Sequence, residues 1–150
     1  MTRGRERCSA FLAGLGVVGL SLVPYAVGWL AEADGQRFGG FFFDLDDSHA
    51  YLAAMQLGIR GEWLFVSLYT PEPQPGVLIH TLYLLLGHLV SFSRSSPLAV
   101  YHAARAVCGL SLLWAAHRFS FIFLRRRSER WTAFLLLALS AGLGWLGELV

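Results

Sequence analysis

Residues 8–31 read CSAFLAGLGVVGLSLVPYAVGWLA, and none of these 24 residues is charged. As an α-helix this stretch would be roughly 36 Å long, at about 1.5 Å per residue, and would cross a hydrocarbon core of about 30 Å. Arg3, Arg5 and Arg7 precede it. The stretch therefore predicts a transmembrane helix. A cleaved signal peptide is the alternative, although the apolar region of such peptides is usually shorter, at about 7 to 15 residues.

The whole composition agrees with a membrane protein. Of the 150 residues, 55% are hydrophobic and 15% are charged, and the mean hydropathy is +0.53. Soluble domains carry about a quarter charged residues. The net charge of +2 is too small to indicate a nucleic-acid partner. Cys8 and Cys108 belong to no motif of metal-ligand spacing, so they indicate neither a disulfide framework nor a zinc site.

Three further apolar segments follow at 76–92, 97–124 and 131–147. We expect an all-α fold with about three transmembrane spans, formed by residues 8–31, 97–124 and 131–147. The loop 32–75 separates the first two apolar segments. It carries most of the acidic residues, namely Glu32, Asp34, Asp44, Asp46, Asp47, Glu62 and Glu72.

Arginine placement predicts the orientation, because short loops rich in Lys and Arg stay in the cytoplasm. The clusters Arg3–Arg7 and Arg125–Arg130 should both be cytoplasmic in a multi-pass protein of the cell membrane, which makes loop 32–75 extracytoplasmic. Segment 76–92 must then lie at the outer interface as a juxtamembrane or re-entrant helix. A tilted span is the alternative for this short segment of 17 residues.

Within the loop, residues 46–59 predict a short amphipathic helix. Tyr51, Leu52, Met55 and Ile59 would form an apolar stripe suited to resting on the membrane surface. Asp46 and Asp47 at its start are candidate catalytic residues. Their carboxylates could act as a general base or hold a divalent cation. Helix capping is the structural alternative, because Asp complements the positive end of the helix dipole.

Arg105 lies inside an apolar segment, about one turn from its predicted outer end and beside His102. An ionisable residue at this depth indicates a function, and the phosphate of an anionic lipid would suit both side chains. The alternative is an arginine that snorkels to the headgroups. A bis-histidine haem would need two facing imidazoles among His80, His88, His102 and His117, which the spacing does not require.

The acidic loop resembles the first extracytoplasmic loop of the GT-C fold glycosyltransferases, such as the protein mannosyltransferase and lipid A aminoarabinose transferase groups. The residues that carry the resemblance are Asp46-Asp47, Tyr51, Ala53, Met55, Gly61 and Trp63, then Pro71 to Gly76, Arg105 and the Arg125–Arg130 turn. It covers roughly residues 8 to 147, and its motifs are short, as such motifs often are.

The resemblance implies sugar transfer from a polyprenyl-phosphate carrier at the outer membrane face. In that family an acidic residue activates the acceptor hydroxyl or helps to hold a metal. Asp46 and Asp47 are the positions that match this motif. Gln74-Pro75-Gly76 departs from the Lys/His-Pro-Pro motif that is common in the family. Family members also have many more helices. The sequence is therefore expected to be an N-terminal module that is inactive alone and works with the remaining helices of a larger transferase. The alternative is a small non-catalytic membrane protein with a scaffolding or assembly role.

Overall fold

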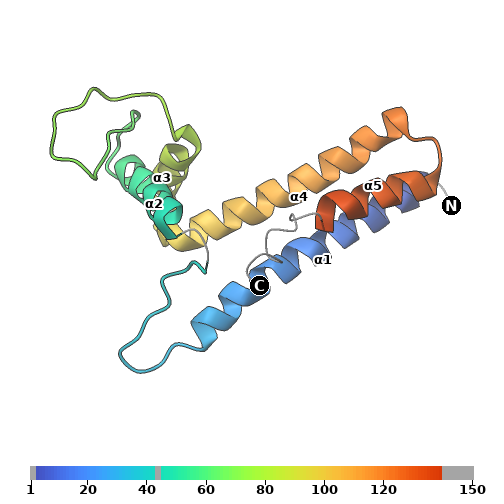
Figure 1. Cartoon of the computed structure of the whole chain (residues 1–150), viewed down its shortest axis with the longest axis horizontal. Helices are drawn as coiled ribbons and strands as arrows, with labels where there is room; N and C mark the ends of the chain where they lie inside the picture. Colours follow the sequence, from blue (N-terminus) through green and yellow to red (C-terminus); the bar gives the residue numbers. More distant parts are fainter. Residues whose placement is uncertain (1–2, 43–44, 140–150) are drawn as a thin grey trace, which may run out of the picture. The chain divides into compact units, whose positions relative to one another are not determined.

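A computed structural model describes residues 3–42 and 45–139 of the chain, which form five α-helices (Figure 1). The helices are α1 (Arg3–Leu30), α2 (Leu45–Ile59), α3 (Thr81–Ser93), α4 (Pro97–Phe123) and α5 (Arg127–Leu139). The chain divides into two compact units. One consists of Met1–Val23 and Ala106–Val150, and the other is Pro24–Arg105. The all-helical prediction is confirmed for the described residues.

Two helices, α1 over Gly4–Leu30 and α4 over Pro97–Phe123, are long and apolar enough to cross a membrane. Each has 27 residues, which gives a length of about 40 Å. Many of their apolar side chains face outward rather than into a protein core, as Leu30 of α1 at 87% and Ile122 of α4 at 70% exposure show. In α1 the helix continues through Pro24 and begins within the arginine-rich segment before residue 8.

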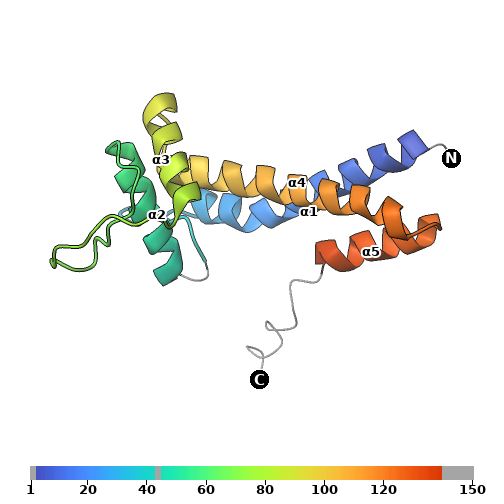
Figure 2. The same cartoon turned by 90° about the horizontal axis from the view of Figure 1, so that it is seen from above.

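Helices α2 and α3 pack side by side in the unit Pro24–Arg105 (Figure 2). Gly58 and Gly87 lie at their crossing, where a Cβ on either glycine would meet backbone atoms of the other helix. Met55 of α2, Val90 of α3 and Val100 of α4 form a small buried cluster. The absent side chains allow the two backbones to approach closely, and the cluster joins the pair to the start of α4.

The apolar stripe of α2 is present, but it does not rest on a membrane surface. Leu52, Met55 and Ile59 belong to a cluster that also includes Tyr83 and Leu86 of α3. Because α3 supplies apolar partners at contact distance, the stripe is covered by protein. The sequence predicted the helix correctly and predicted the wrong partner for its apolar face.

Helix α3 is shorter than the predicted segment 76–92, because it begins only at Thr81. Val77 instead pairs with Phe65 in an isolated antiparallel bridge, with N–H to O distances of 2.9 and 3.0 Å. His80 then adopts a left-handed conformation with φ 53° at the N-cap. With 13 residues, α3 is about 20 Å long and too short to span a bilayer.

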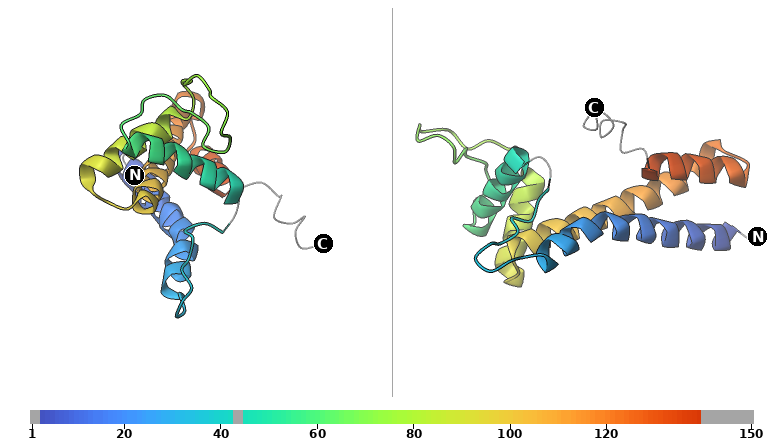
Figure 3. Two further views of the ribbon diagram at one scale, coloured as in Figure 1. Left: turned by 90° about the vertical axis from the view of Figure 1, so that its left-hand side faces the viewer. Right: turned by 60° about the horizontal axis from the view of Figure 1, so that its bottom comes forward.

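A buried ion pair joins distant segments in the unit that holds α5. The guanidinium of Arg130 donates to both carboxylate oxygens of Glu6, at 2.9 and 2.8 Å. It also donates to the carbonyl oxygens of Leu124 and Arg125, at 3.1 and 2.8 Å. The two arginine-rich segments of the chain therefore meet (Figure 3). The span predicted at 131–147 is not shown, because its residues from 140 onward lie outside the described part.

Candidate functional site

Asp46 and Asp47 lie in the first turn of α2, and both are exposed. Because α2 begins at Leu45, its N-cap is residue 44, which lies outside the described residues. Among the described residues, no hydrogen bond joins either carboxylate to the α2 backbone. Their negative charges still complement the positive end of the helix dipole. Both side chains are accessible to a ligand, and their catalytic role stays a prediction.

Three tyrosines from different helices stack next to this acidic turn. The rings of Tyr51 in α2 and Tyr83 in α3 are 4.2 Å apart and inclined by 13°. Tyr83 in turn stacks on Tyr101 of α4, with ring centroids 6.2 Å apart and an angle of 15°. We call these three residues the tyrosine column. It connects α2 to the first turns of α4 through α3.

The tyrosine column is electrostatically coupled to the acidic turn. Burial raises the pKa of Tyr83 above its ordinary value, and Tyr101, Tyr51 and Asp47 add smaller contributions in the same direction. A carboxylate opposes ionisation of a nearby phenol because both groups would then be negative. Asp47 is thus the member of the acidic pair that acts on the column.

Arg105 lies in α4, the helix that also carries Tyr101 of the tyrosine column. It follows Tyr101 by four positions on α4, so both residues share one helix face. Its guanidinium carbon is 4.2 Å from the ring centroid of Tyr25 in α1, which is a cation–π contact. The structure therefore brings the predicted phosphate-binding arginine and the predicted acidic residues into one compact unit.

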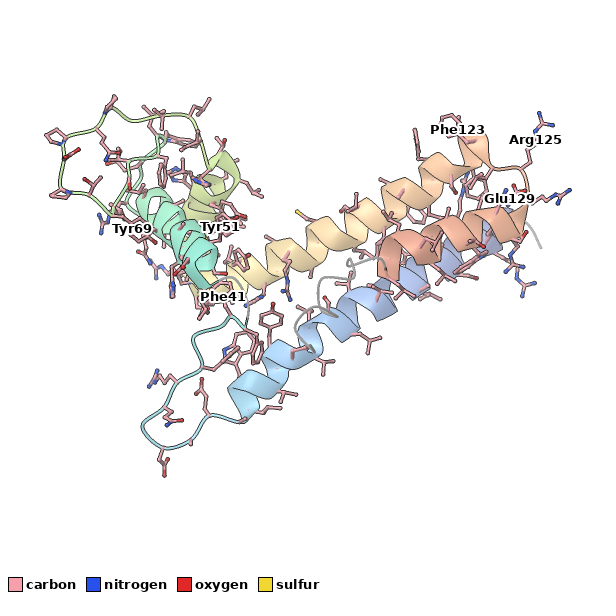
Figure 4. The ribbon with its side chains drawn as sticks, in the orientation of Figure 1. Phe41, Tyr51, Tyr69, Phe123, Arg125 and Glu129 are labelled. Atoms are coloured by element: carbon pink, nitrogen blue, oxygen red, sulfur yellow. The ribbon has the colours of Figure 1, made fainter. Side chains whose placement is uncertain are left out.

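His102 occupies a different environment from the one expected for a phosphate ligand. It is only 6% exposed, and its Nε2 lies 3.0 Å from the carbonyl oxygen of Gly40. Four aromatic rings surround it, those of Tyr25, Trp29, Phe41 and Tyr101 (Phe41 is labelled in Figure 4). This geometry holds the loop before α2 against α4. Phosphate binding by His102 stays a prediction.

The other histidines do not form a facing pair in the described part of the chain. His88 stacks on Trp63 at 4.2 Å, and His80 lies near Phe65 at 4.9 Å. His117 is buried in the other unit, next to Phe121 and Phe134. Among the described residues, no group of three or more His, Cys, Asp or Glu is placed to hold a metal ion.

Sequence reasoning did not select Tyr83 and Tyr101 as site residues. They are 18 positions apart on separate apolar helices, and aromatic residues in such helices ordinarily serve packing. Tyr51 entered only as part of the apolar stripe. No local pattern could reveal the column, because it depends on how α2, α3 and α4 pack.

Comparison with protein-family models, curated proteins and solved structures gives no match for this chain. The resemblance to the GT-C glycosyltransferases therefore stays a prediction from the sequence.

Proposed function

We propose that the chain is a membrane module of a glycosyltransferase that uses a polyprenyl-phosphate-linked sugar. In this proposal Asp47 or Asp46 accepts the proton of the acceptor hydroxyl, and the oxygen forms the new bond to the sugar. The polyprenyl phosphate leaves, and Arg105 stabilises its negative charge. The remaining helices of a larger transferase would complete the donor pocket.

The tyrosine column is the observation that carries this proposal. Its first ring, Tyr51, follows Asp47 by four positions in α2, and its last ring, Tyr101, precedes Arg105 by four positions in α4. Transfer from a sugar phosphate needs an accessible carboxylate near the acceptor and a cation near the leaving phosphate. In this proposal Asp47 and Arg105 provide these charges.

The outer faces of α2 and α3 support a place at the membrane surface. The exposed positions of α2 include Asp46, Asp47 and Gln56, which are polar. Four exposed positions of α3 are apolar and lie three or four residues apart, at Leu82, Leu85, Leu89 and Phe92. Its polar exposed positions, Thr81, Ser91 and Ser93, lie at the two ends of the helix. A pair with one polar and one apolar outer face suits the boundary between water and lipid. The acceptor would reach the acidic turn from water, and the donor lipid would approach from the membrane.

The contact between Glu6 and Arg130 supports an orientation with both arginine clusters in the cytoplasm. It joins the start of α1 to the turn after α4, so these two ends belong on one side of the membrane. Two crossings, by α1 and α4, satisfy this contact. Loop 32–75 and α3 would then be extracytoplasmic.

Binding of a polyprenyl-phosphate sugar to the full chain in lipid nanodiscs tests the phosphate site. We expect Arg105→Gln to weaken binding by about 10- to 100-fold, the range for losing a charge-assisted hydrogen bond. Arg60→Gln is the matched control, because Arg60 is exposed in the same unit and follows α2. Equal affinities of the two variants and the wild type would contradict the proposal and favour a scaffolding role.

Sugar transfer in membranes that hold the assembled transferase tests the acidic pair. We expect Asn at the catalytic position, either Asp47→Asn or Asp46→Asn, to reduce the rate by about 100-fold or more, as for other general bases. Glu72→Gln, in the exposed part of the same loop, is the control. Unchanged transfer in both Asn variants would remove the carboxylates from the mechanism.

A further inference from the structure

An apolar pocket of about 340 Å³ lies between the last two turns of α4 and the middle of α5. Only two of its lining residues are polar, His117 and Ser120. The full lining is Ala116, His117, Phe119, Ser120, Phe123, Leu124, Ala133, Phe134 and Leu137. All of these residues belong to one compact unit, so the pocket is formed by segments whose packing the structure defines.

The walls of this pocket are held in place by Arg130. Its guanidinium binds the carbonyl groups of Leu124 and Arg125 while it pairs with Glu6. It also lies 4.3 Å from the ring centroid of Phe121 on α4. These contacts fix the turn between α4 and α5, and so the pocket exists before any ligand arrives.

His117 lines the pocket with a polar group that lacks a partner. Its side chain is 1% exposed, and neither ring nitrogen has a hydrogen-bond partner among the described residues. The hydroxyl of Ser120 donates to the backbone oxygen of His117, so it does not serve the ring. Buried polar atoms are nearly always paired. Both nitrogens are enclosed by protein atoms, so His117 presents an apolar wall to the pocket.

A basic turn follows Leu124, one of the residues that line the pocket. Arg125, Arg126 and Arg127 follow Leu124 directly, and all three are exposed. Figure 4 shows Arg125 extending outward from the turn between α4 and α5, at the same end of α4 as Phe123. Basic residues next to an apolar groove between membrane helices attract anionic lipid headgroups.

We propose that this pocket binds one acyl chain of an anionic phospholipid, with the lipid phosphate at Arg125. The apolar walls take the chain. The basic turn that follows Leu124 favours an anionic over a zwitterionic headgroup. This site belongs to the unit that lacks the tyrosine column, and its occupancy does not depend on the proposed sugar transfer.

Tryptophan fluorescence tests the proposal, because Trp131 lies next to the pocket. Its ring is 6.2 Å from that of His117 and 5.7 Å from that of Phe134. The full chain is placed in phosphatidylcholine nanodiscs that contain either brominated phosphatidylglycerol or brominated phosphatidylcholine. The part of the quenching that comes from Trp131 is the difference between the wild type and Trp131→Phe. We expect brominated phosphatidylglycerol to quench Trp131 at about fivefold lower concentrations than brominated phosphatidylcholine.

Two variants separate the parts of the site. Ala133→Phe fills the pocket, so neither lipid should quench Trp131 in this variant. Leu136→Phe lies on the exposed face of α5 and should leave the quenching unchanged. Arg125→Gln should remove the fivefold preference, and Arg60→Gln should retain it. Equal quenching by both lipids in the wild type would show adventitious contact only and overturn the proposal. Absent quenching together with a cross-linked dimer would overturn it in favour of a second copy of the chain.

Discussion

Arg130 connects the N-terminal segment to the turn before α5 through its ion pair with Glu6. Removing one member leaves the other charge buried without its counter-ion, which is more damaging than removing both. We expect Glu6→Gln and Arg130→Gln each to lower the unfolding temperature in detergent. In the double variant the decrease should be smaller than the sum of the two single decreases. Circular dichroism of the four proteins measures this coupling.

The neighbouring pair of Arg126 and Glu129 provides the control for this experiment. These side chains are exposed, and their closest atoms are 3.9 Å apart. Exposed pairs contribute about 0 to 1 kcal/mol, so Arg126→Gln should change the unfolding temperature little. An equal effect of Arg126→Gln and Arg130→Gln would contradict a special role for the buried pair.

Tyr83 gives the tyrosine column a pH dependence that can be measured. Because its pKa is raised, the folded state favours the neutral phenol. The stabilisation is present below the ordinary tyrosine pKa of about 10 and is lost as the pH rises through the raised value. We expect Tyr83→Phe to remove a late component of the tyrosinate absorbance titration and to reduce the loss of stability above that pH.

Tyr69→Phe is the matched control for Tyr83, because Tyr69 is 65% exposed and lies in the loop before α3. Its removal should leave the late component in place. If the late component keeps its full amplitude in Tyr83→Phe, burial of this phenol within the column would be refuted.

At the scale of elements, the crossing of α2 and α3 depends on two glycines. A Cβ at Gly87 would meet the carbonyl oxygen of Met55, and backbone atoms cannot move aside as a flexible side chain can. We expect Gly87→Ala to destabilise the protein by about 1–3 kcal/mol, the usual range for overpacking. Chemical denaturation in detergent, followed by tryptophan fluorescence, gives the value.

Gly19→Ala is the control, since a Cβ at this position of α1 has no atom within 4 Å. Alanine favours a helix over glycine by about 1 kcal/mol, so this variant should be neutral or stabilising. A Gly87→Ala protein as stable as the wild type would mean that the two helices do not cross at these glycines.

At the scale of the whole molecule, the proposed orientation predicts which loops are reachable from outside the cell. In a chain with Cys8 and Cys108 replaced by Ser, Gln74→Cys should react with a membrane-impermeant maleimide on intact cells. Ser128→Cys should react only after permeabilisation. Both positions are exposed, so the membrane decides their reactivity. Labelling of Ser128→Cys alone on intact cells would reverse the orientation.

The sequence by itself determined where the two long apolar helices lie, because a long run with few or no charges favours a helix, whose backbone satisfies its own hydrogen bonds. It also identified α2, whose apolar residues recur with helical period. It placed the start of α3 five residues too early, at Gly76. Val77 instead pairs with Phe65, which is distant in the sequence, and this pairing keeps the residues before Thr81 out of the helix.

The tertiary structure decided which side chains meet. Sequence spacing singled out Asp46, Asp47 and Arg105 but could not show that tyrosines of α2, α3 and α4 stack on one another. It likewise predicted that the two arginine clusters share one side, but not that Glu6 and Arg130 form the contact between them. Hydropathy and periodicity are properties of neighbours along the chain. Contacts between residues 124 positions apart depend on the packing of whole helices.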